Sequence, residues 1–534
     1  MAINNIYSDG LAKGWKIRDA SAIDRDETIE ADVVIVGSGA GGGTAAEILS
    51  AAGLQVLMIE EGALYTSSDF KALDEFNAYS QLYQEAAGRA TSDGAIPVLQ
   101  GRAVGGSTVV NWTTSIRTPH ETLAFWAQQF GVKNAGVDDM APWYARMEER
   151  LGVAPWAVEP NANNAVLRDG CEKLGLHWKT VPRNVRGCWN IGYCGLGCPT
   201  NAKQSMLVTT IPTALDHGMS LLHHARVDKL LFDKGRVAGL VAVALNADTR
   251  HTSGTRITVR ARHYILSGGA INTPALLLHS QVPDPHGRVG QRSCIHPVNL
   301  SIAQFDREID GYHGAPQTIY SDHFLWPDDG DIGYKLEVPP LQPMLASSVM
   351  GAFGKALTDD MAQLPNMQVL IALLRDGFHD DSAGGRVRID DSGQPIFDYD
   401  IHDRLWEGLR RAYLTMAEIQ FAAGATRVRP GHLEGAYHRS WSQAKTAIDA
   451  LPMRKHRVGL VTAHLMGGCA MGEDEKRCVV DSYGSHHQIE NLSVFDGSIF
   501  PSSIGANPQL SIYGFTARNT SALLTRLKPA ATAT

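Results

Sequence analysis

The fold of this chain is decided by residues 33–42, VVIVGSGAGG. An apolar, β-branched run leads directly into a G-x-G-x-x-G pattern, and a helical pattern follows over residues 44–52. A second apolar run, residues 56–59, ends at Glu60. The stretch therefore predicts a strand, a glycine turn, a helix and a second strand with an acidic residue at its tip.

Each glycine of the pattern has a physical role. Gly37 permits the tight turn, Gly39 lets backbone approach a pyrophosphate, and Gly42 lets the helix pack close to the strand. The helix N-terminus attracts phosphate charge, and Glu60 is placed to accept hydrogen bonds from a ribose diol. The whole context favours an adenine dinucleotide site over a glycine turn that binds nothing.

Composition excludes several classes of protein. The chain has 534 residues, 44% hydrophobic and 19% charged, which suits two or three globular domains. A net charge of −8 without a basic run argues against a nucleic-acid surface. No apolar run approaches the roughly 18–20 residues of a membrane span, and residues 1–30 lack the apolar core of a signal peptide. We therefore expect a cytoplasmic protein whose tail, residues 529–534, is frayed.

The nucleotide-binding material is interrupted twice, which predicts an interleaved two-domain chain. Glycine-rich and strand-like segments place one domain at 1–111, 201–297 and 456–534. The intervening segments, 112–200 and 298–455, are expected to form a second domain that faces the bound ligand. The fold class is therefore α/β, with a Rossmann-like domain interleaved with an α+β domain.

Four sequence blocks carry a family resemblance. They lie at 37–60, 101–111, 269–277 and 464–508, in this order along the chain. They resemble blocks of the glucose–methanol–choline (GMC) oxidoreductases, which are FAD-dependent alcohol oxidases and dehydrogenases. The third block departs from the family's usual Ser-Gly ending, since residues 280–281 are Ser-Gln. The resemblance implies that the first domain binds FAD and the second binds substrate.

Two branches of the family share further motifs with the chain. Residues 105–111, 496–501 and 507–508 look most like the cholesterol oxidases. Residues 194–198 and 203–205 look more like the long-chain alcohol oxidases. The resemblance thus implies oxidation of a small-molecule alcohol to an aldehyde or ketone, with oxygen or a carrier as electron acceptor.

The resemblance also identifies the residues expected to hold FAD. Glycine-rich segments recur at 101–107 and 496–497, as expected when distant segments wrap one long, permanently held cofactor. Arg102 could equally be a solvated cation, and Val227 an ordinary strand valine. No histidine occurs in 101–112, so we expect non-covalent FAD. Beyond the first glycines and Glu60, the expected cofactor residues are Arg102, Gly105, Gly106, Ser107, Asn111, Val227, Asp496 and Gly497.

The expected catalytic residues are His464 and Asn507, which match the family's active-site positions. An alcohol carbon gives hydride to flavin N5 only as its hydroxyl proton leaves, and an imidazole suits that proton transfer. The carboxamide of Asn507 can donate a hydrogen bond to the alkoxide-like oxygen. The alternative for Asn507 is that it shapes the turn before Pro508.

Three cysteines form a separate motif, Cys188-x₅-Cys194-x₃-Cys198. Some flavin sugar dehydrogenases of this family hold a three-iron cluster with similar spacing, and the cysteine–proline pair fits such ligation. We favour packed thiols over the cluster, because no fourth cysteine lies nearby. A zinc site also lacks a close fourth ligand, so we assign no metal.

The substrate wall and the overall reaction leave alternatives open. Aromatic residues of the inserted segments could line an apolar pocket or simply fill cores. A flavin-containing lyase, or a flavoprotein without catalysis, is the main alternative function, and a nicotinamide dehydrogenase is a weaker one. The sequence does not give the alcohol, the acceptor or the oligomeric state. The aromatic candidates are Trp112, Trp126, Trp143, Trp156, Trp326 and Phe324.

Overall fold

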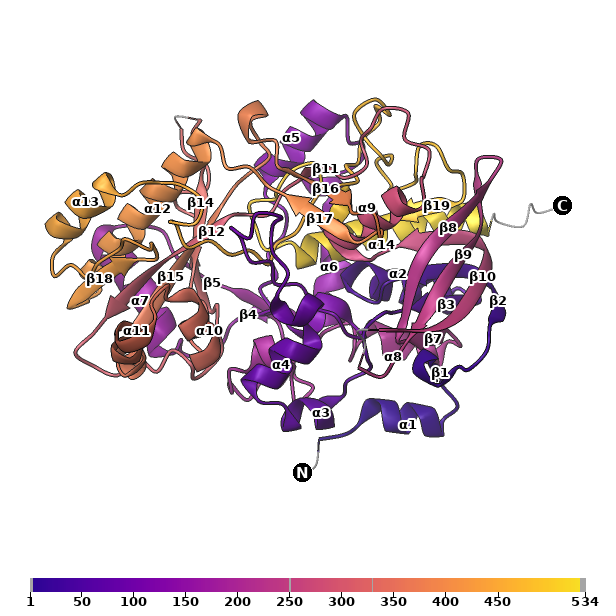
Figure 1. Ribbon diagram of the computed structural model, residues 1–534, viewed down its shortest axis with the longest axis horizontal. Coiled ribbons are helices and arrows are strands. Elements are labelled where there is room, and N and C mark those ends of the chain that lie inside the picture. The colour runs from indigo at the N-terminus through magenta and orange to yellow at the C-terminus, as the bar shows by residue number, and fades with distance from the viewer. Residues whose placement is uncertain (1–2, 249–250, 329, 529–534) are drawn as a thin grey trace.

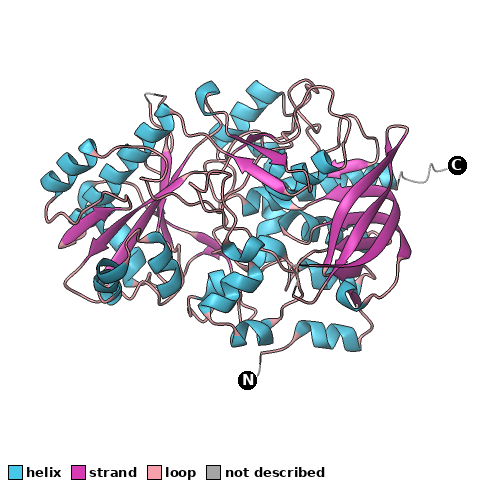
Figure 2. Cartoon of the chain, in the orientation of Figure 1, coloured by secondary structure: helices cyan, strands magenta, loops and turns pink. Residues whose placement is uncertain are grey.

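The computed structural model describes residues 3–248, 251–328 and 330–528. Two sheets lie at opposite ends of an elongated molecule, and helices flank both of them (Figures 1 and 2). The expected frayed tail at 529–534 lies outside the described residues. Within them, no helix combines the length and the apolar content that a membrane crossing requires.

The first sheet has eight strands and a parallel centre (right in Figure 1). Its strand order is β1-β7-β3-β2-β10-β9-β8, and β19 pairs with β10. The antiparallel pairs are those of β9 with β10 and with β8. The strands are β1 (Lys16–Asp19), β2 (Glu27–Val36), β3 (Val56–Ile59), β7 (Ser220–His223), β8 (Ala225–Asp233), β9 (Arg236–Leu245), β10 (Thr252–Leu266) and β19 (Leu492–Val494).

The predicted strand–turn–helix–strand unit is confirmed. β2 pairs in parallel with β3, and helix α2 (Ala40–Ala51) connects them. The helix begins four residues earlier than its apolar pattern, with Gly39 as its N-cap. A Cβ at position 42 would lie 1.9 Å from the carbonyl oxygen of Gly37, so only glycine allows this close packing of helix and turn.

Two further predictions concern the strands that follow. Apolar runs at 226–232 and 237–243 around a Lys-Gly turn predict a hairpin, which is present as β8 and β9, joined at Lys234 and Gly235 with φ of 48° and 77°, as in a type I′ turn. The apolar pattern at 274–278 predicts a helix, and the observed helix is longer, because α9 (Gly269–His279) begins at the glycines. The carboxylate of Asp496 accepts a hydrogen bond from the backbone N–H of Gly269, which satisfies one orphan donor of that helix.

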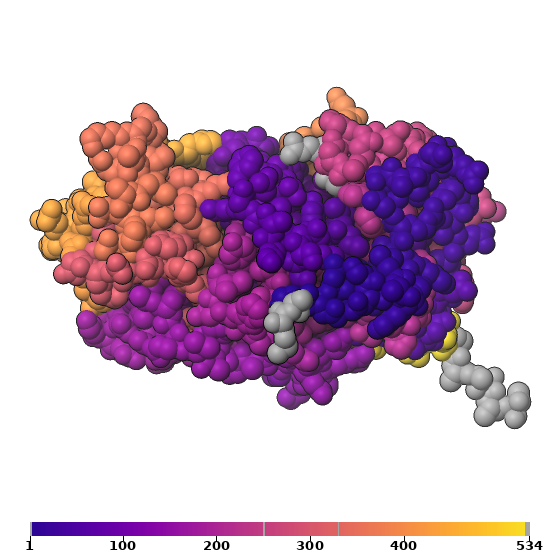
Figure 3. Space-filling model, turned by 90° about the horizontal axis from the view of Figure 1, so that it is seen from below, coloured from indigo at the N-terminus to yellow at the C-terminus, as the bar shows by residue number. Residues whose placement is uncertain are grey.

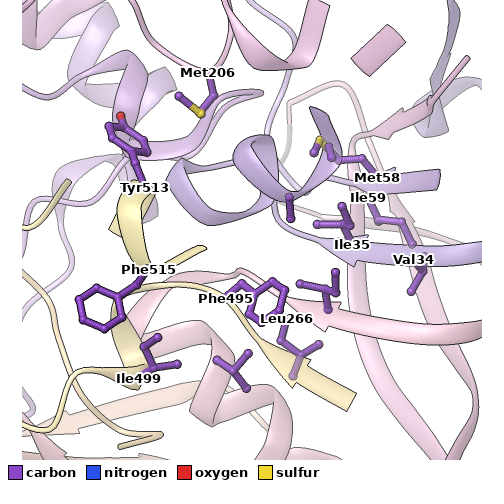
Figure 4. Packing of buried hydrophobic residues seen from close by; sticks show 14 of the residues in the cluster. Val34, Ile35, Met58, Ile59, Met206, Leu266, Phe495, Ile499, Tyr513 and Phe515 are labelled. Carbon is purple, nitrogen blue, oxygen red and sulfur yellow. The ribbon is translucent and has the colours of Figure 1, made fainter. Parts of the chain in front are cut away.

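Buried apolar side chains join the first sheet to its helices (Figure 4). Val34 and Ile35 of β2, with Met58 of β3, are fully buried. Helix α14 (Gln509–Leu527) packs against α2 and contributes Phe515 to the same core. Strands that are apolar on both faces are typical of a parallel sheet covered by helices, so the sequence pattern and the topology agree.

The second sheet has six antiparallel strands (left in Figure 1). Its order is β18-β12-β15-β14-β13-β5. Helices α7 (Ala162–Leu174), α12 (Asp403–Ala422) and α13 (Trp441–Ala450) lie at this end of the molecule, where α7 and α12 contact β15. The strands are β5 (Lys179–Thr180), β12 (Val298–Gln304), β13 (Ile319–Ser321), β14 (Tyr334–Glu337), β15 (Met367–Leu374) and β18 (Arg427–Pro430).

Strand β15 is buried on both faces and divides its side chains by the two-residue period of a strand. Leu370, Ala372 and Leu374 belong to the core that includes α12. Ile371 and Leu373 belong to a separate cluster on the other face, with Val298 of β12. This second face is the one that the functional site uses.

All six strands of this sheet come from the segments expected to form the second domain, although the domain boundaries themselves stay a prediction. The remaining elements are α1 (Ile6–Ala12), α3 (Ser67–Ala72), α4 (Glu75–Leu82), α5 (His120–Phe130), α6 (Val137–Leu151), β4 (Val153–Pro155), β6 (Pro182–Asn184), α8 (Thr210–Asp216), β11 (Gln291–Ser293), α10 (Pro343–Val349), α11 (Gly354–Met361), β16 (Gly385–Ile389) and β17 (Pro395–Asp398). Among these elements, β11, β16 and β17 form a three-stranded sheet, and β4 pairs with β6.

Replacement of Gly42 by alanine tests the close packing of the turn. We expect Gly42→Ala to lower the free energy of unfolding by about 1–3 kcal/mol, because the added methyl group overpacks against the Gly37 carbonyl. Gly39→Ala is the matched control, since its Cβ would meet no atom closer than 3.9 Å. Thermal unfolding of both variants measures the difference, and equal melting temperatures would contradict the packing argument.

Candidate active site

A cavity of about 640 Å³ is lined by residues of both sheets. The ends of β2 and β3 contribute Gly37 and Glu60, and the start of β8 contributes Val227. From the second sheet come Val298 of β12 and Leu373 of β15. Segments that are far apart in the sequence thus meet around one cavity. Residues from all four family-like blocks line it.

The structure brings together most of the residues predicted to hold a dinucleotide. Two of the twelve, Gly42 and Gly105, do not line the cavity and act through packing instead. The other ten line it: Gly37, Gly39, Glu60, Arg102, Gly106, Ser107, Asn111, Val227, Asp496 and Gly497.

The two glycine segments pack directly against each other. A Cβ at Gly106 would lie 2.8 Å from the Cα of Gly39, so a side chain there would separate the segments. Gly105 and Gly106 adopt φ of 99° and 54°, a conformation that glycine adopts readily. The backbone N–H of Gly105 donates to Ser38 Oγ at 2.9 Å. The contact leaves backbone from both segments facing the cavity.

Glu60 is buried and fastened to the first turn. Its carboxylate accepts hydrogen bonds from the N–H and the hydroxyl of Ser38, at 3.0 and 2.6 Å, and from the N–H of Gly62 at 2.8 Å. Burial raises the pKa of Glu60, and these hydrogen bonds oppose that rise. The acid therefore has a fixed position at the tip of β3, where a ligand's hydroxyl groups could reach it.

Arg102 and Asp496 have protein partners of their own. The Nε of Arg102 lies 3.6 Å from Glu61 Oε1. The buried carboxylate of Asp496 accepts hydrogen bonds from Gly269 N–H, from the Thr273 hydroxyl at 2.6 Å and from Ser498. Asp496 thus anchors the start of α9 at the cavity wall, a role that the sequence pattern did not reveal.

His464 and Asn507 lie side by side at the cavity. His464 Nε2 is 3.4 Å from Asn507 Nδ2, and both residues line the same space. The surrounding protein withdraws the imidazole from bulk water, and this desolvation lowers the pKa of His464 to about 4. The ring is therefore neutral at physiological pH, which a proton acceptor requires.

A second histidine, His296, supports His464 from behind. The two Nδ1 atoms are 3.1 Å apart, so one ring donates a hydrogen bond and the other accepts it. The backbone N–H of Gly505 donates to His296 Nε2 at 3.1 Å. Burial holds the pKa of His296 well below its usual range. Sequence analysis missed this residue, because an isolated histidine in an apolar stretch has no distinguishing pattern.

A buried ion pair lies against Asn507. Lys335 Nζ is 2.6 Å from Glu337 Oε1, and both side chains come from β14 with at most 3% exposed. Sequence analysis also missed this pair. The signal was available, however, because two opposite charges at i and i+2 in an apolar segment point to the same face of a strand.

This ion pair fixes the orientation of the Asn507 amide. Lys335 Nζ can only donate, and it does so to Asn507 Oδ1 at 2.5 Å. The carboxylate of Glu337, paired with Lys335, accepts a hydrogen bond from Asn507 Nδ2 at 3.2 Å. Gln317 also donates to Glu337. The NH₂ group is thereby held on the side of His464 and Glu337.

One part of the cavity wall near this network is apolar, although Gln317, which donates to Glu337, also lines the cavity. Val298, Ile371 and Leu373 of the second sheet line it, together with Val461. Of the six aromatic residues considered from sequence, Trp112 alone lines the cavity. Trp126, by contrast, is fully buried in the first core, where it stacks on Phe500. Trp112 packs against the cluster that contains Val298, Ile371 and Leu373, so aliphatic side chains and one indole ring form this wall.

The cysteine motif lies next to the cavity but has no single-ion geometry. The sulfur atoms of Cys188, Cys194 and Cys198 do not all lie within 4.8 Å of one another, in a chain described apart from its ends and three internal residues. Buried Lys203 donates to the carbonyl oxygens of Asn111 and Cys194, at 2.6 and 2.5 Å. This lysine links the cysteine loop to the second glycine segment. Iron analysis of the purified protein decides whether a cluster binds.

A family profile and the sequences of individual relatives both match this chain over most of its length. The sequence profile of GMC oxidoreductase matches residues 79–298 with its N-terminal part and residues 380–516 with its C-terminal part. An uncharacterised GMC-type oxidoreductase of Sinorhizobium fredii is 31% identical over 503 residues, which cover 93% of this chain and 95% of that protein. A long-chain-alcohol oxidase of Arabidopsis thaliana is also 31% identical, over 91% of this chain and 66% of that protein.

Solved structures share the fold at lower identity. Pyridoxine 4-oxidase from Mesorbium loti aligns with a TM-score of 0.68 and 18% identity, over 92% of this chain and 99% of that one. A formate oxidase of Aspergillus oryzae, in a variant made to study FAD modification, gives a TM-score of 0.67 and 15% identity, over 95% and 100% of the two chains. These likenesses concern the fold alone.

A double substitution tests the buried ion pair. We expect Lys335→Met to lower the free energy of unfolding by about 3–5 kcal/mol, because it leaves the Glu337 charge buried without its partner. In the double variant Lys335→Met/Glu337→Gln no charge remains, so much of this loss should be recovered. Thermal unfolding of the wild type, both single variants and the double variant measures the coupling. Additive losses would contradict a coupled pair.

Proposed function

The chain belongs to the GMC oxidoreductase family, and we propose that it uses FAD to oxidise an alcohol with an apolar carbon skeleton to an aldehyde or ketone. The observation that carries this proposal is the pairing of His464 with Asn507 at a cavity that the two glycine segments also line. The long-chain-alcohol oxidases among the relatives support the reaction class.

The cavity suits a dinucleotide. Gly39 is the N-cap of helix α2 and offers no side-chain cap. The first N–H groups of the helix can therefore meet a pyrophosphate. Gly106 brings a second stretch of backbone to the same place, and Glu60 offers a fixed carboxylate for a ribose diol. We propose non-covalent binding of FAD by these residues, and when bound, FAD supplies the hydride acceptor.

We assign His464 as the proton acceptor and Asn507 as the hydrogen-bond donor to the substrate oxygen. Desolvation keeps the imidazole neutral, and the fixed NH₂ group of Asn507 faces its Nε2. Together these groups bind an alkoxide-like oxygen more tightly than a neutral hydroxyl, which lowers the barrier for loss of hydride from the carbon.

The two histidines must share their protons in one particular way for this role. His464 Nε2 can accept a proton only when the ring's own proton is on Nδ1, from which it donates to His296 Nδ1. His296 then carries its proton on Nε2, facing the N–H of Gly505. The N–H of His296 Nε2 and the N–H of Gly505 would then face each other, and two donors cannot bond. The catalytic tautomer therefore requires that the Gly505–His296 hydrogen bond is broken. We propose that His296 couples the tautomer of His464 to this backbone hydrogen bond: while the bond is made, neutral His464 carries its proton on Nε2, and when it opens, Nε2 becomes the acceptor.

The ion pair supports the same chemistry electrostatically. Lys335 lies 2.5 Å from Asn507 Oδ1, which polarises the amide and makes its NH₂ a stronger donor. The lysine charge lowers the pKa of His464, and the Glu337 charge raises it. The two opposite charges therefore hold the amide without imposing a large net field on the imidazole.

The substrate class follows from the wall beside this network. Val298, Ile371 and Leu373 offer no hydrogen bonds, so they would reject hydroxyl-rich sugars, which need buried polar partners. Burial of each additional CH₂ group of a substrate against such a wall contributes about 0.8 kcal/mol. We therefore expect preference for aliphatic alcohols that increases with chain length until the cavity is filled.

Anaerobic addition of alcohols tests the reaction. We expect a series of primary alcohols to bleach the flavin band near about 450 nm, with rates that rise with chain length. His464→Ala should retain FAD but slow bleaching by roughly 10²–10⁴-fold, because it removes general-base assistance. His456→Asn, an exposed position, is the control. A flavin that stays oxidised with every alcohol would favour the lyase alternative, and a colourless purified protein would exclude FAD.

The pH dependence tests the assigned base. Only the neutral ring accepts a proton, and the pKa of His464 is lowered to about 4. We therefore expect kcat/KM to stay level from neutral pH to about pH 5 and to fall at lower pH. Lys335→Met should move this limb to higher pH and Glu337→Gln to lower pH, because each removes one opposing charge. A limb near pH 6.5 in the wild type would contradict the buried-base assignment.

A further inference from the structure

Asp19, His223 and His224 form a cluster at the edge of the first sheet, and none of the three lines the cavity. Asp19 ends β1 and pairs with His223 at the end of β7. One ligand atom from each of the three residues lies within 4.8 Å of the others, and no other such trio occurs among the residues that the structure describes. Figure 3 shows the indigo N-terminal segment on the surface at this end of the molecule.

An unusual backbone conformation creates the cluster. Successive side chains of a strand normally point to opposite faces. His224 departs from the strand with φ of 54°, in the left-handed region that few residues other than glycine adopt. The turn brings its ring beside that of His223, with centroids 4.9 Å apart. Backbone strain of this kind costs about 1–3 kcal/mol and is concentrated at functional sites.

Two imidazole nitrogens of the cluster have no partner. His223 and His224 are 8% and 6% exposed, and within the described residues neither His223 Nδ1 nor His224 Nε2 makes a hydrogen bond. Buried polar atoms without partners are rare, because each costs about 1–3 kcal/mol. Water or an ion is a common reason for such an atom.

The carboxylate completes the donor set and provides a route from solvent. Asp19 Oδ1 is 2.7 Å from His224 Nδ1 and accepts a hydrogen bond from Ser21 N–H at 2.9 Å. The Asp19 side chain is 40% exposed, whereas the two rings are buried. A cation could therefore enter from the Asp19 side and meet the imidazoles behind it.

We propose that Asp19, His223 and His224 bind one divalent transition-metal ion of the zinc class. Two imidazole nitrogens and one carboxylate oxygen suit Zn²⁺ and similar ions, whereas Mg²⁺ and Ca²⁺ prefer oxygen ligands throughout. A tetrahedral ion with bonds of 2.0–2.1 Å needs ligand atoms about 3.3 Å apart. Asp19 Oδ1 and His224 Nδ1 lie 2.7 Å apart, so they would separate slightly as the ion replaces the proton between them. Water fills the remaining position.

The position of the site gives it a structural consequence. The backbone next to the trio holds Glu60, since Glu60 N–H donates to Leu222 O at 2.9 Å and Ala225 N–H donates to Glu60 O at 3.0 Å. The N–H of His224 lies 3.4 Å from Gly62 O. A metal ion bound here would fasten β1 to the corner between β7 and β8, and through it to the β3 tip.

Metal titration of the intact protein tests this inference. Zn²⁺ is added in buffered amounts to metal-free protein that retains its native cofactor content, and bound metal and melting temperature are measured. We expect one equivalent to be bound and the melting temperature to rise with Zn²⁺ concentration. His224→Asn removes the imidazole but keeps a residue that tolerates positive φ. This variant should bind one equivalent less, or bind it at least about tenfold more weakly.

His456→Asn is the matched control, because His456 also has a positive φ, 61°, but is exposed and outside the trio. It should bind Zn²⁺ as the wild type does. X-ray absorption at the zinc edge separates this site from the cysteines: nitrogen and oxygen ligands at 2.0–2.1 Å support it, and sulfur near 2.3 Å would overturn it. Equal binding by the wild type and His224→Asn would also overturn the proposal, and would leave the Asp19–His224 contact as a hydrogen bond only.

Discussion

The close approach of two stretches of glycine backbone is the constraint on which the rest of the molecule depends. Gly39 and Gly106 meet where no side chain could be accommodated on Gly106, and Gly42 lets α2 lie against the turn that precedes it. Serine and glutamate side chains then lock this contact, since Ser38 joins the Gly105 N–H to the Glu60 carboxylate. Gly39 and Gly106 both line the cavity, so their contact forms part of its wall on the side of the first sheet. Glycine is used here because it lacks a side chain.

The same constraint explains what could be predicted from the sequence. Local patterns reveal local geometry, so the β2–α2–β3 unit and the β8–β9 hairpin were recognisable. Partnerships between distant segments were recognisable only where a family block marked both partners, as for His464 and Asn507. The start of α9 was misplaced because its first turn is stabilised by Asp496, which lies 227 residues away in the sequence.

The residues that sequence analysis missed share one property: their role depends on a partner brought by the fold. His296 is a single histidine until Gly505 and His464 are placed on either side of it. Lys335 and Glu337 have no evident role until the fold shows that their strand is buried and that both side chains contact Asn507. A buried pair of opposite charges is a weak source of stability, because desolvation offsets much of the attraction. Its contacts with the Asn507 amide fit a role in positioning.

Strand β15 has a consequence for how substrate range could change in this molecule. Its odd-numbered side chains, Ile371 and Leu373, face the cavity, while its even-numbered ones hold the helical layer behind the sheet. Because the two sets lie on opposite faces, a change at Ile371 or Leu373 would alter the apolar cluster that includes Val298 and leave the packing against α12 in place. The alternation of side chains along one strand thus separates the residues that shape the cavity from those that hold the helices behind the sheet.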